Sequence, residues 1–137
     1  MAAAQCADLA VVELLLDHGA NVSAEGGMWG SALVAAAYGE NQKVVELLID
    51  RGADLHFKGG HYGNALQAAC VKAGVETIDY ILDHAIDLVN HRDGKYHTAL
   101  IAAAYFDRTE VVSKLLEVGA DFRYQGGQYR SAITAAA

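Results

Sequence analysis

The 137-residue sequence contains no proline, only two cysteines and no long apolar run. Cys6 and Cys70 are too few for a disulfide framework and fit a reducing compartment, so we expect an intracellular, cytoplasmic protein. No apolar run approaches the roughly 18–20 residues that span a bilayer. Residues 1–20 lack the basic start of a signal peptide, and acidic residues interrupt their apolar stretch. The sequence therefore predicts neither a membrane span nor secretion.

Basic residues are also scarce. Lys and Arg number 10 against 17 Asp and Glu, which gives a net charge of −7, and the basic residues form no run. Because proteins neutralise nucleic-acid phosphates with clustered Lys and Arg, this charge argues against a nucleic-acid partner. With 53% hydrophobic residues, the chain is long enough for one domain with a core and too short for two comfortable ones.

The most informative feature of the sequence is an internal repeat. A run of alanines starts at Ala2, Ala35, Ala68, Ala102 and Ala135, at intervals of 33, 33, 34 and 33 residues. An apolar phrase of the type Val-Val-x-x-Leu-Leu recurs within 11–21, 44–54, 77–87 and 111–121, and a phrase of the type Gly-Gly-x-Tyr recurs within 26–33, 59–66, 93–100 and 126–133. This spacing predicts a single domain, 1–137, made of repeats 26–58, 59–92 and 93–125 between partial repeats 1–25 and 126–137.

Each period predicts two helices and a turn. Ser31 is placed to start a short helix of small residues. Residues 44–50 have the apolar spacing of a second helix, and Gly52 follows it where a left-handed cap is wanted. The Gly26-Gly27 pair permits the positive φ angles of a tight turn. Because one helix pair cannot bury both of its faces, we predict an all-α repeat solenoid of antiparallel helix pairs joined by β-hairpin-like fingers.

The chain resembles the ankyrin repeat family over essentially its whole length. The matching features are the Gly-Ala-Asp or Gly-Ala-Asn phrase at 19–21, 52–54 and 119–121, the Val-Val-x-x-Leu-Leu helix before it, and the period. The family's Thr-Pro-Leu-His phrase is degenerate here and never keeps its proline or histidine, as in Ser-Ala-Leu-Val at 31–34. The style of the Gly-Gly-x-Tyr phrase is similar to that of ankyrin arrays in filamentous-fungal multidomain proteins.

The resemblance implies a non-catalytic module that binds a partner protein on its concave face of fingers and first helices. The variable positions that match this face are Met28, Tyr38, His61, Lys72, Lys95, His97, Tyr105, Phe106, Gln128 and Arg130. The outward positions of the second helices hold most of the acidic residues. We therefore expect a neutral-to-basic concave side, rich in the aromatic and Arg residues that supply binding hot spots, and an acidic convex side.

One finger position is aromatic in every repeat: Trp29, Tyr62, Tyr96 and Tyr129. These rings could form a ladder on which a ligand stacks. Residues that do not vary between repeats usually hold the stack together, however, so we predict a structural spine.

We expect no catalytic residue, cofactor or metal. His91, Asp93 and His97 lie around one finger and could form a crude metal site, but no Cys or His spacing matches a zinc pattern. Cys70 stands where other repeats have the third alanine, so we expect a buried small residue rather than a nucleophile.

The third period is irregular. Ala85 replaces the capping glycine, which costs about 1 kcal/mol if the positive φ is retained. One extra residue also falls within 88–92. Two interpretations remain open: a longer, charged finger at 89–97 that reaches toward a partner, or a tolerated loop insertion.

Neither end of the sequence carries the polar capping repeat that solenoids need for solubility. The chain is then either a segment of a longer array, which we favour, or a unit whose ends complete one another. In the second case residues 131–137 of one copy supply the half-helix that residues 1–5 lack, and the result is head-to-tail self-assembly.

Overall fold

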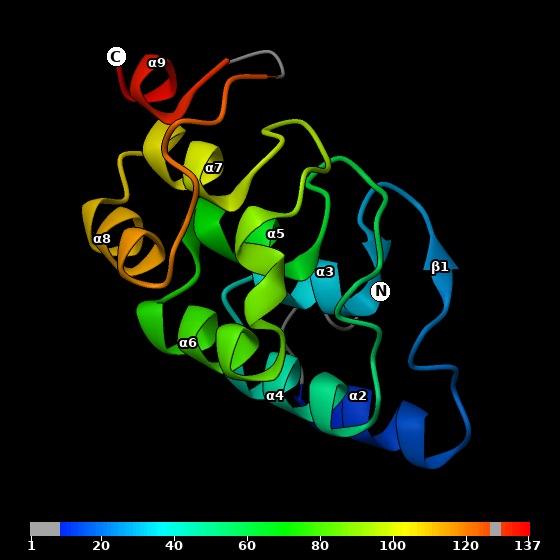
Figure 1. The fold of residues 1–137 in the computed structure, drawn as a ribbon. Coiled ribbons are helices and arrows are strands. Elements are labelled where there is room, and N and C mark those ends of the chain that lie inside the picture. Colours follow the sequence, from blue (N-terminus) through cyan, green and yellow to red (C-terminus); the bar gives the residue numbers. More distant parts are fainter. Residues whose placement is uncertain (1–8, 127–129) are drawn as a thin grey trace.

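The computed structural model describes residues 9–126 and 130–137, and its helices stack in two rows (Figure 1). The outer row contains α2 (Leu9–Asp17), α4 (Gln42–Asp50), α6 (Val75–His84) and α8 (Thr109–Glu117). The inner row contains α3 (Ala32–Tyr38), α5 (Ala65–Lys72), α7 (Ala99–Tyr105) and α9 (Ala132–Ala136). The predicted all-α repeat solenoid is confirmed.

The fingers project from the inner row. In the first, β1 (Glu25–Gly26) pairs in antiparallel fashion with β2 (Gly30–Ser31), and an isolated bridge joins Asp93 to His97 in the third. Glycine is required at Gly60, where φ is +70° and an added Cβ would lie 2.7 Å from the carbonyl oxygen of Trp29 in the preceding finger. The finger glycines therefore serve the turn and the close approach of neighbouring repeats.

The inner helices begin at the polar residues that the repeat pattern indicates. Ser31, Asn64, Thr98 and Ser131 each have extended φ and ψ angles, and each side-chain oxygen accepts the backbone N–H three residues ahead. Such an N-cap stabilises a helix by about 1 kcal/mol. The prediction of a helix start at Ser31 is confirmed.

Three of the outer helices end in the same glycine motif. At Gly52 φ is +90°, its N–H donates to the carbonyl of Ile49 at 3.0 Å, and the N–H of Ala53 donates to the carbonyl of Leu48 at 2.9 Å. Gly19 and Gly119 have φ of +92° and +95° and the same pair of bonds. This is the Schellman motif, which satisfies carbonyls that the helix end leaves unpaired.

Helix α6 ends differently. Ala85 has a φ of −153° and a ψ of 68°, so the left-handed conformation expected at this position is absent, and so is its strain. The chain instead enters a 3-10 helix, η1 (Ile86–Asn90), which buries Leu88 and Val89. Gly94 keeps the positive φ of the finger turn after this longer connection.

Small residues let the inner helices pack closely. Ala35, Ala36 and Ala37 are completely buried, and Cys70, in the position of Ala37, is completely buried as well. The larger side chains of the outer row, such as Leu48, fill the space between the two rows. The core thus follows the division of small and bulky residues that the sequence shows.

Polar contacts join each outer helix to the one before it. The Nη2 atom of Arg51 lies 2.8 Å from Oδ1 of Asp17, and Nζ of Lys114 lies 2.8 Å from Oδ1 of Asp79. The hydroxyl of Tyr80 donates to Asp50 at 2.7 Å. Exposed pairs of this kind add little stability because solvent screens them, but they show which residues face each other across the repeats.

Candidate functional site

Backbone hydrogen bonds join successive fingers into one file. The N–H of His61 donates to the carbonyl of Met28 at 3.0 Å, and the N–H of Lys95 donates to the carbonyl of His61 at 3.0 Å. Three residues predicted to bind a partner therefore lie side by side at the same level of their fingers. The side chain of Met28 is 60% exposed, His61 is exposed and Lys95 is partly exposed.

A file of aromatic rings runs beside these residues. The ring centroids of Trp29 and Tyr62 are 5.5 Å apart and those of Tyr62 and Tyr96 are 6.4 Å apart, both in stacked arrangements. The predicted structural spine is confirmed for these three residues. Tyr129, and with it the predicted binding residue Gln128, lies outside the described residues.

The ends of the inner helices join this spine. The ring centroid of Tyr38 lies 4.6 Å from that of Trp29 and 4.7 Å from that of Tyr62. The ring centroids of Tyr105 and Phe106 lie 5.4 and 5.5 Å from that of Tyr96. Tyr105 and Phe106 keep 43% and 36% of their surface exposed. These three predicted binding residues thus hold the fold together on one side and contribute to the surface on the other.

Cations lie over several of the rings. The ammonium of Lys72, an exposed residue, is 4.6 Å from the ring centroid of Tyr38, and that of Lys95 is 5.5 Å from Tyr96. The guanidinium of Arg92 is 4.2 Å from the ring of Tyr124. A cation over an aromatic face gains about 0.5–1 kcal/mol at an exposed site, which helps to hold these side chains in place.

The last residue of each finger has a positive φ. Gly30 and Gly63 occupy this position in two repeats, with φ of +83° and +76°. His97 and Arg130 occupy it in the other two, with φ of +66° and +61°, although such angles are unfavourable for residues with a Cβ. The ring of His97 lies 3.0 Å from the hydroxyl of Tyr124, and Arg130 is exposed.

A buried glutamine sets the position of the third finger. Gln67 is 1% exposed, and its Nε2 donates to the carbonyls of His97 at 2.7 Å and His91 at 3.3 Å. Its side-chain oxygen also accepts the N–H of Asn64, which completes a capping box at the start of α5. Gln67 was not among the predicted site residues, because its role depends on a neighbouring repeat that one helix pattern does not reveal.

Comparison with known families agrees with this architecture. A model of three ankyrin repeats matches residues 33–126, more than half of the chain, and a model of a single ankyrin repeat matches residues 1–26. The chain belongs to the ankyrin repeat family. No curated protein matches it. Ankyrin repeats are generally protein–protein interaction modules and are typically non-enzymatic.

The cysteine of the second ankyrin repeat has the environment of a core residue. Cys70 is completely buried, and burial raises the pKa of its thiol to about 12, although Arg108 partly opposes this shift. Because the thiolate is the reactive form, this side chain is inert near neutral pH. The prediction that Cys70 is buried is confirmed.

The histidines considered for a metal site face different partners. His91 lies 3.6 Å from Asp87, whereas His97 contacts Tyr124 and its backbone pairs with Asp93. Within residues 9–126 and 130–137, no group of three His, Cys, Asp or Glu side chains is arranged to hold a metal ion. In the same part of the chain, no helix is long and apolar enough to cross a membrane.

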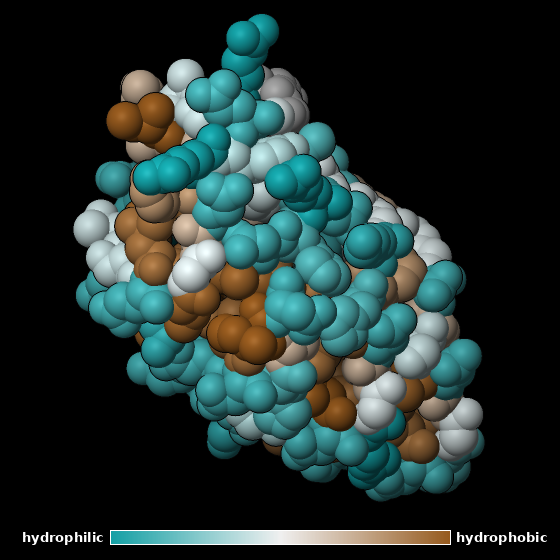
Figure 2. Space-filling model, viewed as in Figure 1, coloured by the Kyte–Doolittle hydropathy of each residue, from teal (hydrophilic) through white to brown (hydrophobic). Residues whose placement is uncertain are grey.

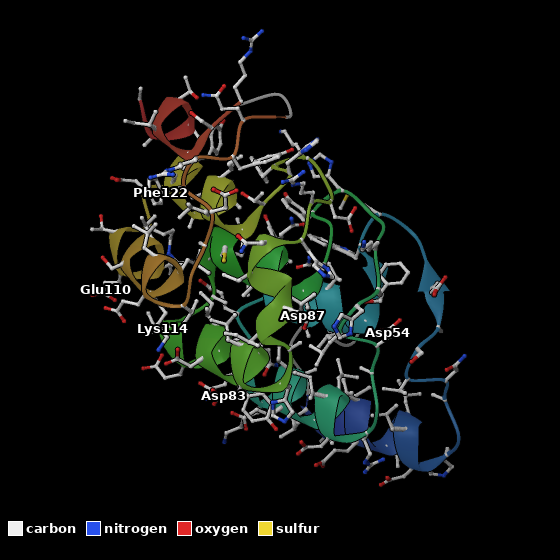
Figure 3. All side chains as sticks on the ribbon, viewed as in Figure 1. Asp54, Asp83, Asp87, Glu110, Lys114 and Phe122 are labelled. Atoms are coloured by element: carbon white, nitrogen blue, oxygen red, sulfur yellow. The ribbon has the colours of Figure 1, made fainter. Side chains whose placement is uncertain are left out.

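Charged residues lie on both sides of the ankyrin stack. Lys72, Lys95 and Arg92 lie among the aromatic rings of the fingers and inner helices. Asp83 and Glu117 are exposed on the outer helices, and Figure 3 shows Asp83 on this row. The outer row also carries Arg51 and Lys114, and the third finger carries Asp93, so the charge difference between the two sides stays a prediction.

Proposed function

We propose that a partner protein binds on the finger face of this ankyrin stack. We define the finger face as Met28, Tyr38, His61, Lys72, Lys95, Tyr105 and Phe106. The observation that supports the proposal most directly is the file of Met28, His61 and Lys95, whose backbones are hydrogen-bonded to one another. Because the finger backbone is held in place before binding, little backbone conformational entropy is lost when a partner binds, and the entropic cost falls mainly on ordering the side chains.

The chemistry of the finger face favours a partner segment that carries carboxylates beside apolar side chains. Lys72 presents an ammonium next to the ring of Tyr38, and Lys95 does so next to Tyr96. Met28 and Phe106 add exposed apolar surface. A carboxylate can pair with such a cation while a neighbouring apolar group covers the ring, and aromatic anchors are common among binding hot spots.

Backbone strain beside the finger face also supports the proposal. His97 and Arg130 hold positive φ angles at a position where two other repeats have glycine. Non-glycine residues in this conformation are common at functional sites, where the surrounding structure holds them, although Glu40 and Asp107 adopt it in turns between inner and outer helices. Arg130 is exposed and lies at a finger end, where it would extend the finger face toward the last repeat.

The proposal is tested with charge-reversal variants on opposite sides of the stack. Proteins captured from the native cell extract by the wild-type chain are identified, and the affinity of a purified partner is measured for Lys72→Glu, Lys95→Glu and the control Asp83→Lys. We expect each lysine variant to weaken binding about tenfold or more, a loss of about 1.4 kcal/mol, and the control to leave it unchanged. Equal affinity of all variants would place the partner elsewhere.

Lysine variants are preferred to alanine changes at Tyr105 and Phe106. Both aromatic residues pack against Tyr96, so their loss would alter the spine as well as the surface. Circular dichroism and thermal unfolding of each variant then show whether lost binding reflects the surface or the fold.

A further inference from the structure

The third finger starts with an aspartate followed by a glycine. Asp93 and Gly94 form the only Asp-Gly pair in the sequence, and no Asn-Gly pair occurs. The other three fingers have two glycines at the same place. The first finger forms the corresponding bridge from Gly26, so the turn does not require a side chain at Asp93.

The carboxyl group of Asp93 lies against the next peptide nitrogen. The N–H of Gly94 donates to Oδ1 of Asp93 at 2.8 Å, which brings this nitrogen close to the carboxyl carbon. The other oxygen, Oδ2, is buried and accepts no hydrogen bond from residues 9–126 and 130–137. Within that part of the chain, no donor has to be displaced when this oxygen leaves.

The backbone at Gly94 admits only glycine. Its φ is +63°, and an added Cβ would lie 2.5 Å from the backbone nitrogen of Gly63 in the preceding finger. Any other residue would be strained and would meet this neighbour. The packing of the two fingers therefore keeps the least shielded kind of peptide nitrogen beside the carboxyl group of Asp93.

Water can reach this part of the finger. Asp93 and Gly94 are each partly exposed, and residues 93–97 form a loop at the edge of the molecule (Figure 1). Figure 2 shows mostly hydrophilic residues at the surface where this loop lies. A cyclic intermediate formed at the pair would therefore be open to hydrolysis.

We propose that Asp93 isomerises to isoaspartate through attack by the nitrogen of Gly94. The nitrogen bonds to the protonated carboxyl group at its carbon, and Oδ2 leaves as water with the acid proton and the amide proton, which closes a five-membered succinimide ring. A water molecule then opens the ring at one of its two carbonyl carbons. Opening at the side-chain carbonyl restores aspartate. Opening at the main-chain carbonyl leaves isoaspartate, whose chain runs through the former side chain.

Isoaspartate lengthens the main chain of the finger by one carbon atom. The N–H of Asp93 now donates to the carbonyl of His97 at 2.8 Å, and the N–H of Lys95 donates to the carbonyl of His61 at 3.0 Å. Both bonds depend on the present chain length, so the rearrangement moves Lys95 out of the file of fingers. Any loss of partner affinity rests on the proposed function, whereas the isomerisation itself does not.

Mass spectrometry of the purified chain tests the proposal. The protein is stored folded near neutral pH, and digests are fragmented by electron-transfer dissociation, which distinguishes isoaspartate from aspartate of equal mass. Asp54 is the internal control, since it is exposed and accepts a backbone N–H but precedes leucine. We expect isoaspartate to form at Asp93 about tenfold faster or more, a barrier lower by about 1.4 kcal/mol. Equal rates at Asp93 and Asp54 would overturn the proposal.

Variants at the same position connect the chemistry to the finger. Asp93→Asn should react faster, because an uncharged amide is attacked more readily than a carboxylate. Asp93→Glu should not react, since its ring would need six members, and Asp93→Gly restores the glycine pair of the other fingers. Circular dichroism checks that each variant folds. An Asp93→Asn variant that stays unchanged on storage would overturn the proposal.

Amide exchange at Lys95 measures the opening of the finger. We expect this amide to exchange faster in stored wild type than in fresh wild type, and at the same rate in stored and fresh Asp93→Glu. Unchanged exchange in isomerised wild type would overturn the displacement of Lys95. An opened finger that keeps its affinity for a partner would contradict the proposed binding role of Lys95 and leave the isomerisation standing.

Discussion

Tyr62 lies at the centre of the aromatic spine, and its ring centroid is within 6.4 Å of those of Trp29, Tyr38 and Tyr96. Burial raises the pKa of its hydroxyl to about 12, and its hydrogen bond with Tyr38 adds to the shift. The pKa of Tyr80 is also raised to about 12, chiefly because its hydroxyl donates to Asp50. Both residues thus keep their protons in the folded chain at pH values where an unfolded tyrosine has lost its proton.

This difference predicts a loss of stability in alkali. Between pH 10, the pKa of an unfolded tyrosine, and about pH 12, the folded chain binds more protons than the unfolded chain, so the free energy of unfolding falls as pH rises. The stabilisation that comes from the two raised tyrosine pKa values is fully present below pH 10 and is lost as the pH rises to about 12. Urea unfolding of the wild type, Tyr62→Phe and Tyr80→Phe at several pH values measures it. Each variant should lose less stability than the wild type over this interval, and parallel curves would contradict the assignment.

Gln67 shows how one buried side chain can fix a finger. Replacing it with leucine keeps a similar volume but removes the donor to the carbonyl of His91 and one of the two donors to the carbonyl of His97, which keeps the N–H of Asp93. We expect Gln67→Leu to lower the free energy of unfolding by about 2–3 kcal/mol. Gln42→Leu is the matched control, since Gln42 is exposed and its side chain donates to Glu46 on its own helix, and its effect should stay within about 0.5 kcal/mol. Similar losses in the two variants would argue against this role.

At the scale of the element, the outer helices end in two ways. Glycine should be the more stable residue at Gly52, where φ is positive, and alanine should be the more stable residue at Ala85, where φ is negative. Gly52 has a φ of +90° with no heavy atom within 4 Å of an added Cβ, so Gly52→Ala should cost about 1 kcal/mol through backbone strain alone. Ala85 has a negative φ, so Ala85→Gly relieves no strain and also loses a buried methyl group. We expect it to cost about 1 kcal/mol as well. Thermal or urea unfolding measures the free energy of unfolding of both variants. An Ala85→Gly variant more stable than the wild type would contradict the observed end of α6.

The elements also show how far the sequence alone could lead. The helix starts at Ser31 and the glycine ends such as Gly52 were predictable, because their signals are local and recur with the period. The 3-10 helix η1 was not, since an extra residue within 88–92 could be accommodated at several points and the packing of Leu88 decides among them.

The candidate site was predictable in outline and not in its contacts. The fixed repeat spacing was enough to place Met28, His61 and Lys95 at equivalent positions, and the structure shows their fingers joined. It could not show that Tyr38 packs into the spine, because contacts between repeats depend on their rotation and distance. Partner binding by these residues stays a prediction.

At the scale of the whole molecule, stability is carried by contacts between neighbouring repeats. In a solenoid each repeat contacts only those beside it, so the central repeats gain stability from two neighbours and the terminal ones from one. Helix α5 packs against both α3 and α7 and is buried along almost its whole length. Helix α2 buries only Val12 among its residues, and α9 buries none.

Amide hydrogen exchange should report this gradient. In dilute solution we expect the amides of α5 to exchange most slowly and those of α2 and α9 to exchange fastest, because the ends open locally without unfolding the centre. Equal exchange rates in α5 and in the two end helices would contradict this gradient.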